Sequence, residues 1–174
     1  MMDFSNLPKI VAVDFDGYLV EDKFPNVGEP KAFEIALVKA LYEMGVRTIL
    51  WTSRTDEHLG LAVKACESFG LMFDAINTNI EEVKALTGKD TRKVYANVYL
   101  DDHAGVLSIR QIARHLELDP NTLTAEHDLY FTQIVKYVSD CSCEGVSFEY
   151  CMNHLKEAFH AERRRNRSKR TEIS

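Results

Sequence analysis

Two pairs of aspartates are the residues of this chain whose type and spacing first suggest chemistry. Asp14 and Asp16 follow the apolar run KIVAVD, and Asp101 and Asp102 follow the run VYANVYL. If both runs are strands of a parallel sheet, their carboxyl ends meet at one edge, and the four carboxylates would repel one another without a cation. Oxygen ligands with room for water favour Mg²⁺, which favours a phosphate-bearing substrate. We therefore predict Mg²⁺ as the cofactor, with Asp14, Asp16, Asp101 and Asp102 as its ligands.

Phosphoryl transfer also needs a nucleophile, a proton carrier and groups that bind the phosphoryl oxygens. A carboxylate held against a metal-bound phosphate is placed as a nucleophile, which is the role we predict for Asp14, and Asp16 can act first as acid and then as base. Thr52 and Lys93 offer a hydrogen bond and a positive charge. The predicted catalytic set is Asp14, Asp16, Thr52 and Lys93, and the predicted substrate-binding set is Gly17, Thr52, Ser53 and Lys93.

The elements that must position these residues alternate along the first hundred positions. Short apolar runs predict strands at 9–14, 46–51, 72–77 and 94–100. Amphipathic spacing predicts helices at 30–44, 56–69 and 79–87. Strands separated by helices imply a parallel sheet, so we expect an α/β fold of Rossmann-like type with flanking helices.

The second part of the chain has a different pattern. Helical spacing recurs at 106–118, 124–139 and 147–167, and we find no strong fifth strand. We therefore predict a phosphatase core at 1–105 and a helical C-terminal extension at 106–174 that packs on it, with a basic tail at 163–174.

Several of these features, taken in order, resemble the haloacid dehalogenase (HAD) superfamily of phosphohydrolases. They are DFDG after an apolar strand, a threonine ending the second strand, a lysine, and LDD ending the fourth strand. The stretches GEP, ILWTSRT, FDAIN and RKVYANVYLDD are similar to small capless bacterial and phage-type members. The resemblance covers roughly residues 9–105 and implies a HAD-like, capless fold and a phosphatase that forms an aspartyl phosphate.

The resemblance also implies a role for each matching residue. Asp14 would be the phosphoaspartyl nucleophile, and Asp16 the general acid/base and a main-chain metal ligand. Thr52 and Lys93 would bind phosphate, and Asp101 and Asp102 would be the metal pair, with Asp102 as the direct ligand. One residue departs from the pattern, because Tyr18 stands where the family usually has threonine. We expect either weakened activity or a changed flap, with Tyr18 lining the substrate mouth.

Two other functions fit parts of the same pattern. A phospho-acceptor signalling domain also gathers aspartate, threonine and lysine at strand ends, but its acceptor normally follows the third strand and its acidic pair the first. The order found here favours the hydrolase. The second alternative is a non-catalytic binding protein on the same HAD-like fold, which Tyr18 and the added helices suggest.

Composition and charge limit the partners that we expect. The chain has 174 residues and a net charge of −6, yet six of its 21 Lys and Arg residues lie in 163–170. An acidic body disfavours nucleic acid and membrane surfaces, so nucleic acid is conceivable only through the tail. The expected substrate is a phosphorylated small molecule or nucleotide, in a cytoplasmic protein without a membrane span.

The spacing of Cys141, Cys143, Cys151 and His154 fits a zinc site poorly.

Overall fold

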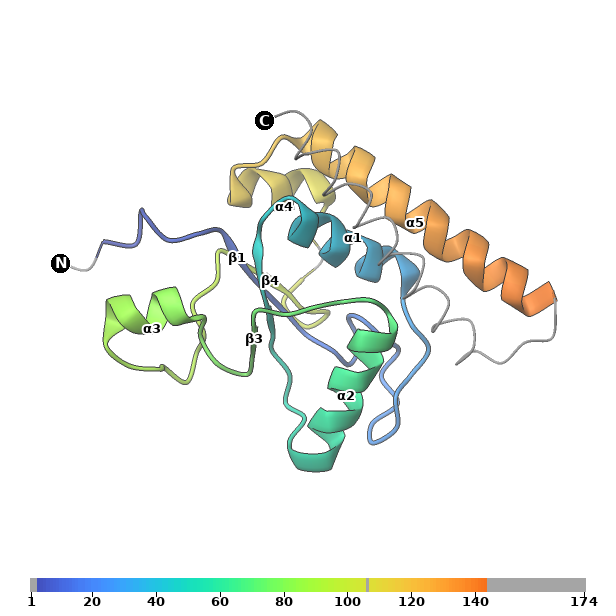
Figure 1. Cartoon of the computed structure of the whole chain (residues 1–174), viewed down its shortest axis with the longest axis horizontal. Helices are drawn as coiled ribbons and strands as arrows, with labels where there is room; N and C mark the ends of the chain where they lie inside the picture. The colour runs from blue at the N-terminus through green and yellow to red at the C-terminus, as the bar shows by residue number, and fades with distance from the viewer. Residues whose placement is uncertain (1–2, 106, 144–174) are drawn as a thin grey trace, which may run out of the picture.

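A four-stranded parallel sheet forms the centre of the computed structural model, which describes residues 3–105 and 107–143 (Figure 1). The strands are β1 (Ile10–Val13), β2 (Arg47–Leu50), β3 (Ala75–Ile76) and β4 (Val98–Leu100). Their order is β3-β2-β1-β4, and each neighbouring pair is parallel. The predicted α/β fold of Rossmann-like type is confirmed.

Five helices flank the sheet within these described residues: α1 (Ala32–Glu43), α2 (Asp56–Ser68), α3 (Glu81–Thr87), α4 (Ile109–Leu116) and α5 (Pro120–Cys143). Helix α5 begins earlier than the predicted position 124 and runs further than 139. Proline suits the first turn of a helix because a backbone N–H at that position has no partner within the helix, so nothing is lost when the residue has none. The side chain of Asp119 accepts from the backbone N–H of Asn121 (3.0 Å) and from the Thr122 hydroxyl (2.9 Å), which fixes this start. The predicted helix at 147–167 and the tail at 163–174 lie outside the described residues.

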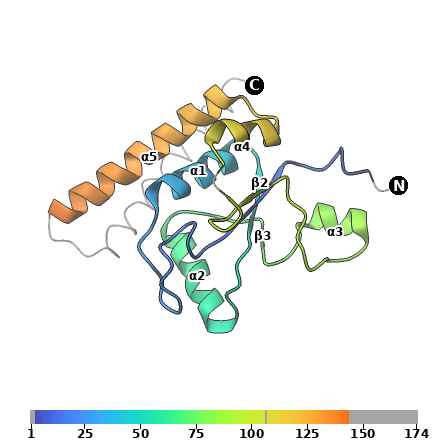
Figure 2. The ribbon, with the colours of Figure 1, turned by 180° about the vertical axis from the view of Figure 1, so that it is seen from behind.

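Side chains of β1 point alternately into two apolar clusters, one on each face of the sheet. Val11 and Val13 join the cluster that contains the buried residues of α1, α4 and α5. Ile10 and Ala12 join the cluster that contains Val83 of α3. Because both faces are covered, β1 is apolar at every position, as a buried parallel strand requires. Figure 2 shows the same arrangement from behind, with α3 apart from the layer of α1, α4 and α5.

The described part of the predicted C-terminal extension, residues 107–143, packs beside α1. Leu116 of α4 and Leu123 and Tyr130 of α5 are buried in the same cluster as Leu37 of α1. Figures 1 and 2 both show α5 lying along α1. The division of the chain at residue 105 stays a prediction.

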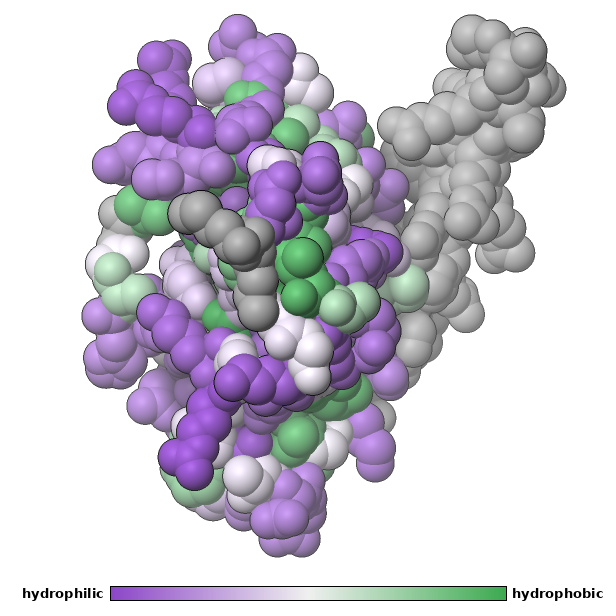
Figure 3. All heavy atoms as spheres, turned by 90° about the vertical axis from the view of Figure 1, so that its left-hand side faces the viewer, coloured by the Kyte–Doolittle hydropathy of each residue, from purple (hydrophilic) through white to green (hydrophobic). Residues whose placement is uncertain are grey.

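The outer surface is mostly polar on the side where α3 lies. Figure 3 shows this face, on which hydrophilic side chains surround smaller apolar areas. Among the described residues, no helix combines the length and the apolar character that crossing a membrane requires.

Candidate active site

Three carboxylates meet where β1 and β4 end. Val13 and Leu100 are paired in these neighbouring strands, so Asp14 and Asp101 follow at the same edge of the sheet. Oxygen atoms of Asp14, Asp101 and Asp102 all lie within 4.8 Å of one another. Three acidic oxygens this close fit one hard divalent cation, because such a cation takes several oxygen ligands within a little over 2 Å. The site therefore suits the predicted Mg²⁺.

The protonation of Asp14 reflects this crowding. The pKa of Asp14 is raised to about 6, mainly by burial and also by the charges of Asp101, Asp102 and Asp16, while a hydrogen bond from the Phe15 backbone opposes the rise. A bound cation would counter both effects, since it favours the ionised carboxylate. The arrangement thus favours cation binding at neutral pH.

Gly17 makes room for Asp102. Its φ angle of +78° lies in the left-handed region, and a Cβ atom at this position would lie 2.2 Å from Oδ2 of Asp102. Any other residue would displace that carboxylate or the loop. Asp101 is fixed differently, since its Oδ1 accepts the backbone N–H of His103 at 2.8 Å. A substrate-binding role for Gly17 and the preference for Asp102 as direct ligand stay predictions.

Asp16 is held by a residue that the sequence analysis did not assign. Arg54 donates from Nε to Oδ2 of Asp16 at 2.6 Å and from Nη2 to Oδ1 at 2.7 Å. The carboxylate of Asp16 therefore faces a guanidinium and is not part of the three-carboxylate cluster. The signal for Arg54 was present in the run ILWTSRT, where it stands two positions after Thr52.

Thr52 lies at the end of β2, next to β1, and is fixed by its backbone. Its N–H donates to Oδ1 of Asn77 at 2.9 Å, and its hydroxyl oxygen accepts the backbone N–H of Arg54 at 3.2 Å. Since that hydroxyl acts as an acceptor here, its own proton is left to donate elsewhere. Asn77, in the run FDAIN, was also not assigned from sequence. Ser53 is exposed beside Thr52.

Lys93 is exposed and lies over an aromatic ring. Its Nζ is 5.1 Å from the ring centroid of Tyr99, and it forms no ion pair with any part of the chain that the structure describes. The preceding loop is ordered by buried Asn79, which accepts the backbone N–H of Tyr95 at 2.6 Å and donates to Asp90 at 2.7 Å. The structure thus does not bring Lys93 into contact with the carboxylates, and its phosphate-binding role stays a prediction.

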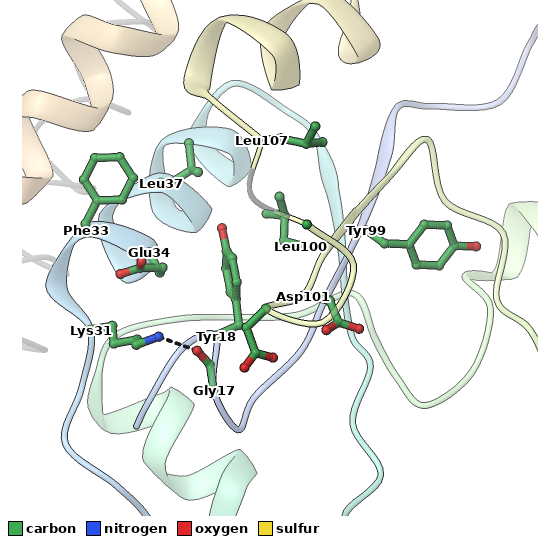
Figure 4. Close-up of a pocket in the computed structure, with 12 residues that line it drawn as sticks. Gly17, Tyr18, Lys31, Phe33, Glu34, Leu37, Tyr99, Leu100, Asp101 and Leu107 are labelled. Carbon is green, nitrogen blue, oxygen red and sulfur yellow. Dashed lines mark hydrogen bonds between the residues drawn. The ribbon is translucent and has the colours of Figure 1, made fainter. Parts of the chain in front are cut away.

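A cavity of about 100 Å³ opens next to the carboxylates (Figure 4). Its lining includes Asp101, Asp102, Tyr18 and, from α1, Glu34 and Leu37. Figure 4 shows the ring of Tyr18 pointing toward α1. Burial raises the pKa of the Tyr18 hydroxyl, and the charge of Glu34 adds to the rise. Tyr18 therefore packs inward toward α1 and also lines this cavity, and its expected place at a substrate mouth stays a prediction.

Comparisons with known proteins give one informative match. No family model and no curated protein matches the chain. A solved structure described as the conserved protein coded by locus from Bacteroides thetaiotaomicron is similar, with 32% sequence identity and a TM-score of 0.53. The match covers 64% of this chain and 91% of that one. That description names no activity. The chain thus belongs to the same family as this conserved bacterial protein.

Proposed function

We propose that this chain is a Mg²⁺-dependent phosphohydrolase that acts through an aspartyl phosphate on Asp14. The observation that supports the proposal best is the cluster of Asp14, Asp101 and Asp102 at the end of two neighbouring parallel strands. Ligands of open parallel sheets bind at this edge. A HAD-type phosphatase, to which the sequence motifs point, uses the same arrangement.

The three clustered carboxylates are the residues that would hold the metal. Bound there, Mg²⁺ would orient a phosphoryl oxygen and offset its charge and that of the carboxylates. Asp14, which is half-buried at the end of β1, is the carboxylate that a nucleophilic role requires. Burial limits competing water at this oxygen.

The proposed reaction has two displacement steps. An oxygen of Asp14 forms a bond to phosphorus while the ester P–O bond breaks, and Asp16 gives a proton to the leaving oxygen. A water molecule then attacks phosphorus and gives a proton to Asp16, and the bond to Asp14 breaks to release inorganic phosphate. Both oxygens of Asp16 accept from Arg54, so the proton that Asp16 carries would occupy the second lone pair of one of these oxygens.

Two further residues would bind the phosphoryl group. The hydroxyl proton of Thr52, which bonds no acceptor among the described residues, can donate to a phosphoryl oxygen at the end of β2. Lys93 would have to turn away from the ring of Tyr99 to bring its charge to the site. Between β1 and α1 the chain forms a loop without a helical insertion, so the site is capless on that side and open to a phosphorylated small molecule or a nucleotide.

Hydrolysis of p-nitrophenyl phosphate tests this proposal. We expect release of nitrophenol with Mg²⁺, none with a chelator, and none from Asp14→Asn at any Mg²⁺ concentration. Asp3→Asn is the matched control, since Asp3 is an exposed carboxylate that accepts a hydrogen bond from Ser5 and lies in no acidic cluster among the described residues, and it should leave the rate unchanged. Binding of Mg²⁺ without turnover of any ester would instead favour the non-catalytic binding protein.

A further inference from the structure

Arg54 is a buried cation that contacts two separate parts of the chain. Its side chain is wholly inaccessible to solvent, and its guanidinium forms a two-bond ion pair with Asp16. The same group donates from Nη1 to the carbonyl of Pro25 at 3.0 Å and from Nη2 to the carbonyl of Asn26 at 2.7 Å. The planar side chain of Arg54 thus joins Asp16, in the loop directly after β1, to Pro25 and Asn26 further along the chain.

That second segment is the tip of a hairpin-like loop over residues 20–30. The loop is closed at its base, where Val20 and Pro30 form a bridge and the backbone N–H of Glu21 donates to the carbonyl of Glu29 at 2.9 Å. The backbones approach closely there, since a Cβ atom on Gly28 would lie 1.9 Å from the carbonyl oxygen of Glu21. The side of the tip is completed by Phe24, whose ring centroid is 5.2 Å from the Arg54 guanidinium.

We propose that Arg54 is a positioning residue that fixes Asp16 and the tip of the 20–30 loop as one unit. The catalytic consequence rests on the proposed function, whereas the anchoring of the loop does not. Arg54 sets the direction of the Asp16 carboxylate, and the ion pair with Asp16 in turn keeps the guanidinium where it binds the two loop carbonyls. Asp16 therefore anchors the loop in addition to carrying protons.

The geometry of the arginine side chain explains why the contact with Asp16 and the contacts with the loop carbonyls depend on each other. A guanidinium offers several N–H donors in one plane, so it can serve two carboxylate oxygens and two carbonyls at once, which a lysine ammonium cannot do. Asp16 is the one carboxylate paired with Arg54 among the described residues. Without it the buried cation would lack its counter-charge, and the loop contacts would weaken.

Hydrogen exchange of the 20–30 loop tests the anchoring directly, without any assay of activity. We expect Arg54→Lys and Asp16→Asn each to speed exchange of the Glu21 amide by about tenfold or more. The first variant removes the guanidinium that bonds the loop carbonyls, and the second removes the counter-charge that keeps the guanidinium in place. The double variant should exchange no faster than either single one. Arg47→Lys is the matched control, since Arg47 also bonds two carboxylates, Asp74 and Glu82, but at the opposite end of β2.

Unchanged exchange at Glu21 in Arg54→Lys, or clearly additive effects in the double variant, would overturn the anchoring. If Arg54→Lys does not fold, Asp16→Asn decides alone. That variant leaves Arg54 and the loop carbonyls chemically unaltered, so faster exchange in the loop must come through the lost ion pair, and unchanged exchange would refute the proposal.

The preference for leaving groups tests the catalytic part. We expect Arg54→Lys, like Asp16→Asn, to lower hydrolysis of an alkyl phosphate at least about tenfold more than that of p-nitrophenyl phosphate, because a misplaced or missing acid matters most for a poor leaving group. Arg47→Lys should leave the ratio of the two rates unchanged. An unchanged ratio in Arg54→Lys would refute the positioning of Asp16.

Absence of any hydrolysis by the unaltered protein would refute the proposed function, while the exchange experiment still decides the anchoring.

Discussion

At the scale of single residues, the site combines burial with crowded negative charge. Asp14 is half-buried beside Asp101 and Asp102, and burial raises its pKa to about 6. The ordinary value is 3.8, so the folded protein binds a proton at Asp14 more readily than the unfolded chain does. Without a cation, Asp14 thus lowers the stability of the fold as the pH rises from about 4 to about 6.

We expect Asp14→Asn to stabilise the metal-free protein at pH 7. The shift from 3.8 to about 6, reduced for partial exposure, corresponds to about 1 to 2 kcal/mol in the free energy of unfolding. At pH 4 the two proteins should differ little. Urea unfolding in a chelator at both pH values measures this, and a variant that is less stable at pH 7 would show that the ionised Asp14 is well accommodated without metal.

Tyr18 contributes to packing as well as to the cavity. Its ring packs against the apolar cluster of α1, so Tyr18→Thr should lower the free energy of unfolding by about 2 to 4 kcal/mol. Tyr18→Phe keeps the ring and should stay within about 1 kcal/mol of the unaltered protein. Urea unfolding of both variants checks this. Equal stability of the threonine variant would mean that the ring adds nothing to the core.

At the scale of elements, the sequence predicted the strands and helices well because burial dominates their patterns. Apolar runs marked all four strands, yet each strand is shorter than predicted, and β3 and β4 are shortened most. At the start of β3, the side chain of Asp74 accepts the backbone N–H of Thr48 at 2.8 Å, and before β4 the side chain of Asn97 accepts that of Ile10 at 2.8 Å. In both places a side chain replaces a strand carbonyl, which apolar patterning does not reveal.

The contact of α1 with α5 contains a buried lysine. Lys39 is 6% exposed, its Nζ lies 6.0 Å from the ring centroid of Tyr130, and burial lowers its pKa to about 7. The unfolded chain keeps this proton to a higher pH, so Lys39 makes the fold more stable as the pH rises from about 7 to about 10.

Lys39→Met should remove most of this pH dependence. The quantity to compare is the rise in the free energy of unfolding between pH 7 and pH 9. We expect this rise in the unaltered protein to exceed that in Lys39→Met by about 1 to 2 kcal/mol. Lys136→Met, on an exposed position of α5, is the control and should keep the full dependence. If the free energy of unfolding depends on pH in the same way in Lys39→Met and in the unaltered protein, the lowered pKa of Lys39 would be contradicted.

At the scale of the whole molecule, the topology brings the acidic residues together. The carboxylates of Asp14, Asp101 and Asp102 were expected at one edge because their strands are parallel, and the structure brings these three together. Loop conformation decides two other contacts, the ion pair of Asp16 with Arg54 and the position of Lys93 over the ring of Tyr99. The apolar pattern of the strands carries no information about loop conformation.

Magnesium should therefore stabilise the protein as a whole. At a concentration about 100 times its dissociation constant, Mg²⁺ should add about 2.7 kcal/mol to the free energy of unfolding. Asp101→Asn and Asp102→Asn should each reduce the effect, whereas Asp119→Asn, at the exposed start of α5, should not. Thermal unfolding with and without Mg²⁺ measures this. Equal stabilisation in all variants would place the cation elsewhere.

The covalent intermediate on Asp14 tests the central claim most directly. The protein is mixed with Mg²⁺ and p-nitrophenyl phosphate, quenched in acid within the first turnover, digested and analysed by mass spectrometry. We expect one phosphoryl group on the peptide that contains Asp14, and none in Asp14→Asn or in the presence of a chelator. Turnover without a phosphorylated protein, a phosphoryl group on another residue, or no turnover at all would contradict the account.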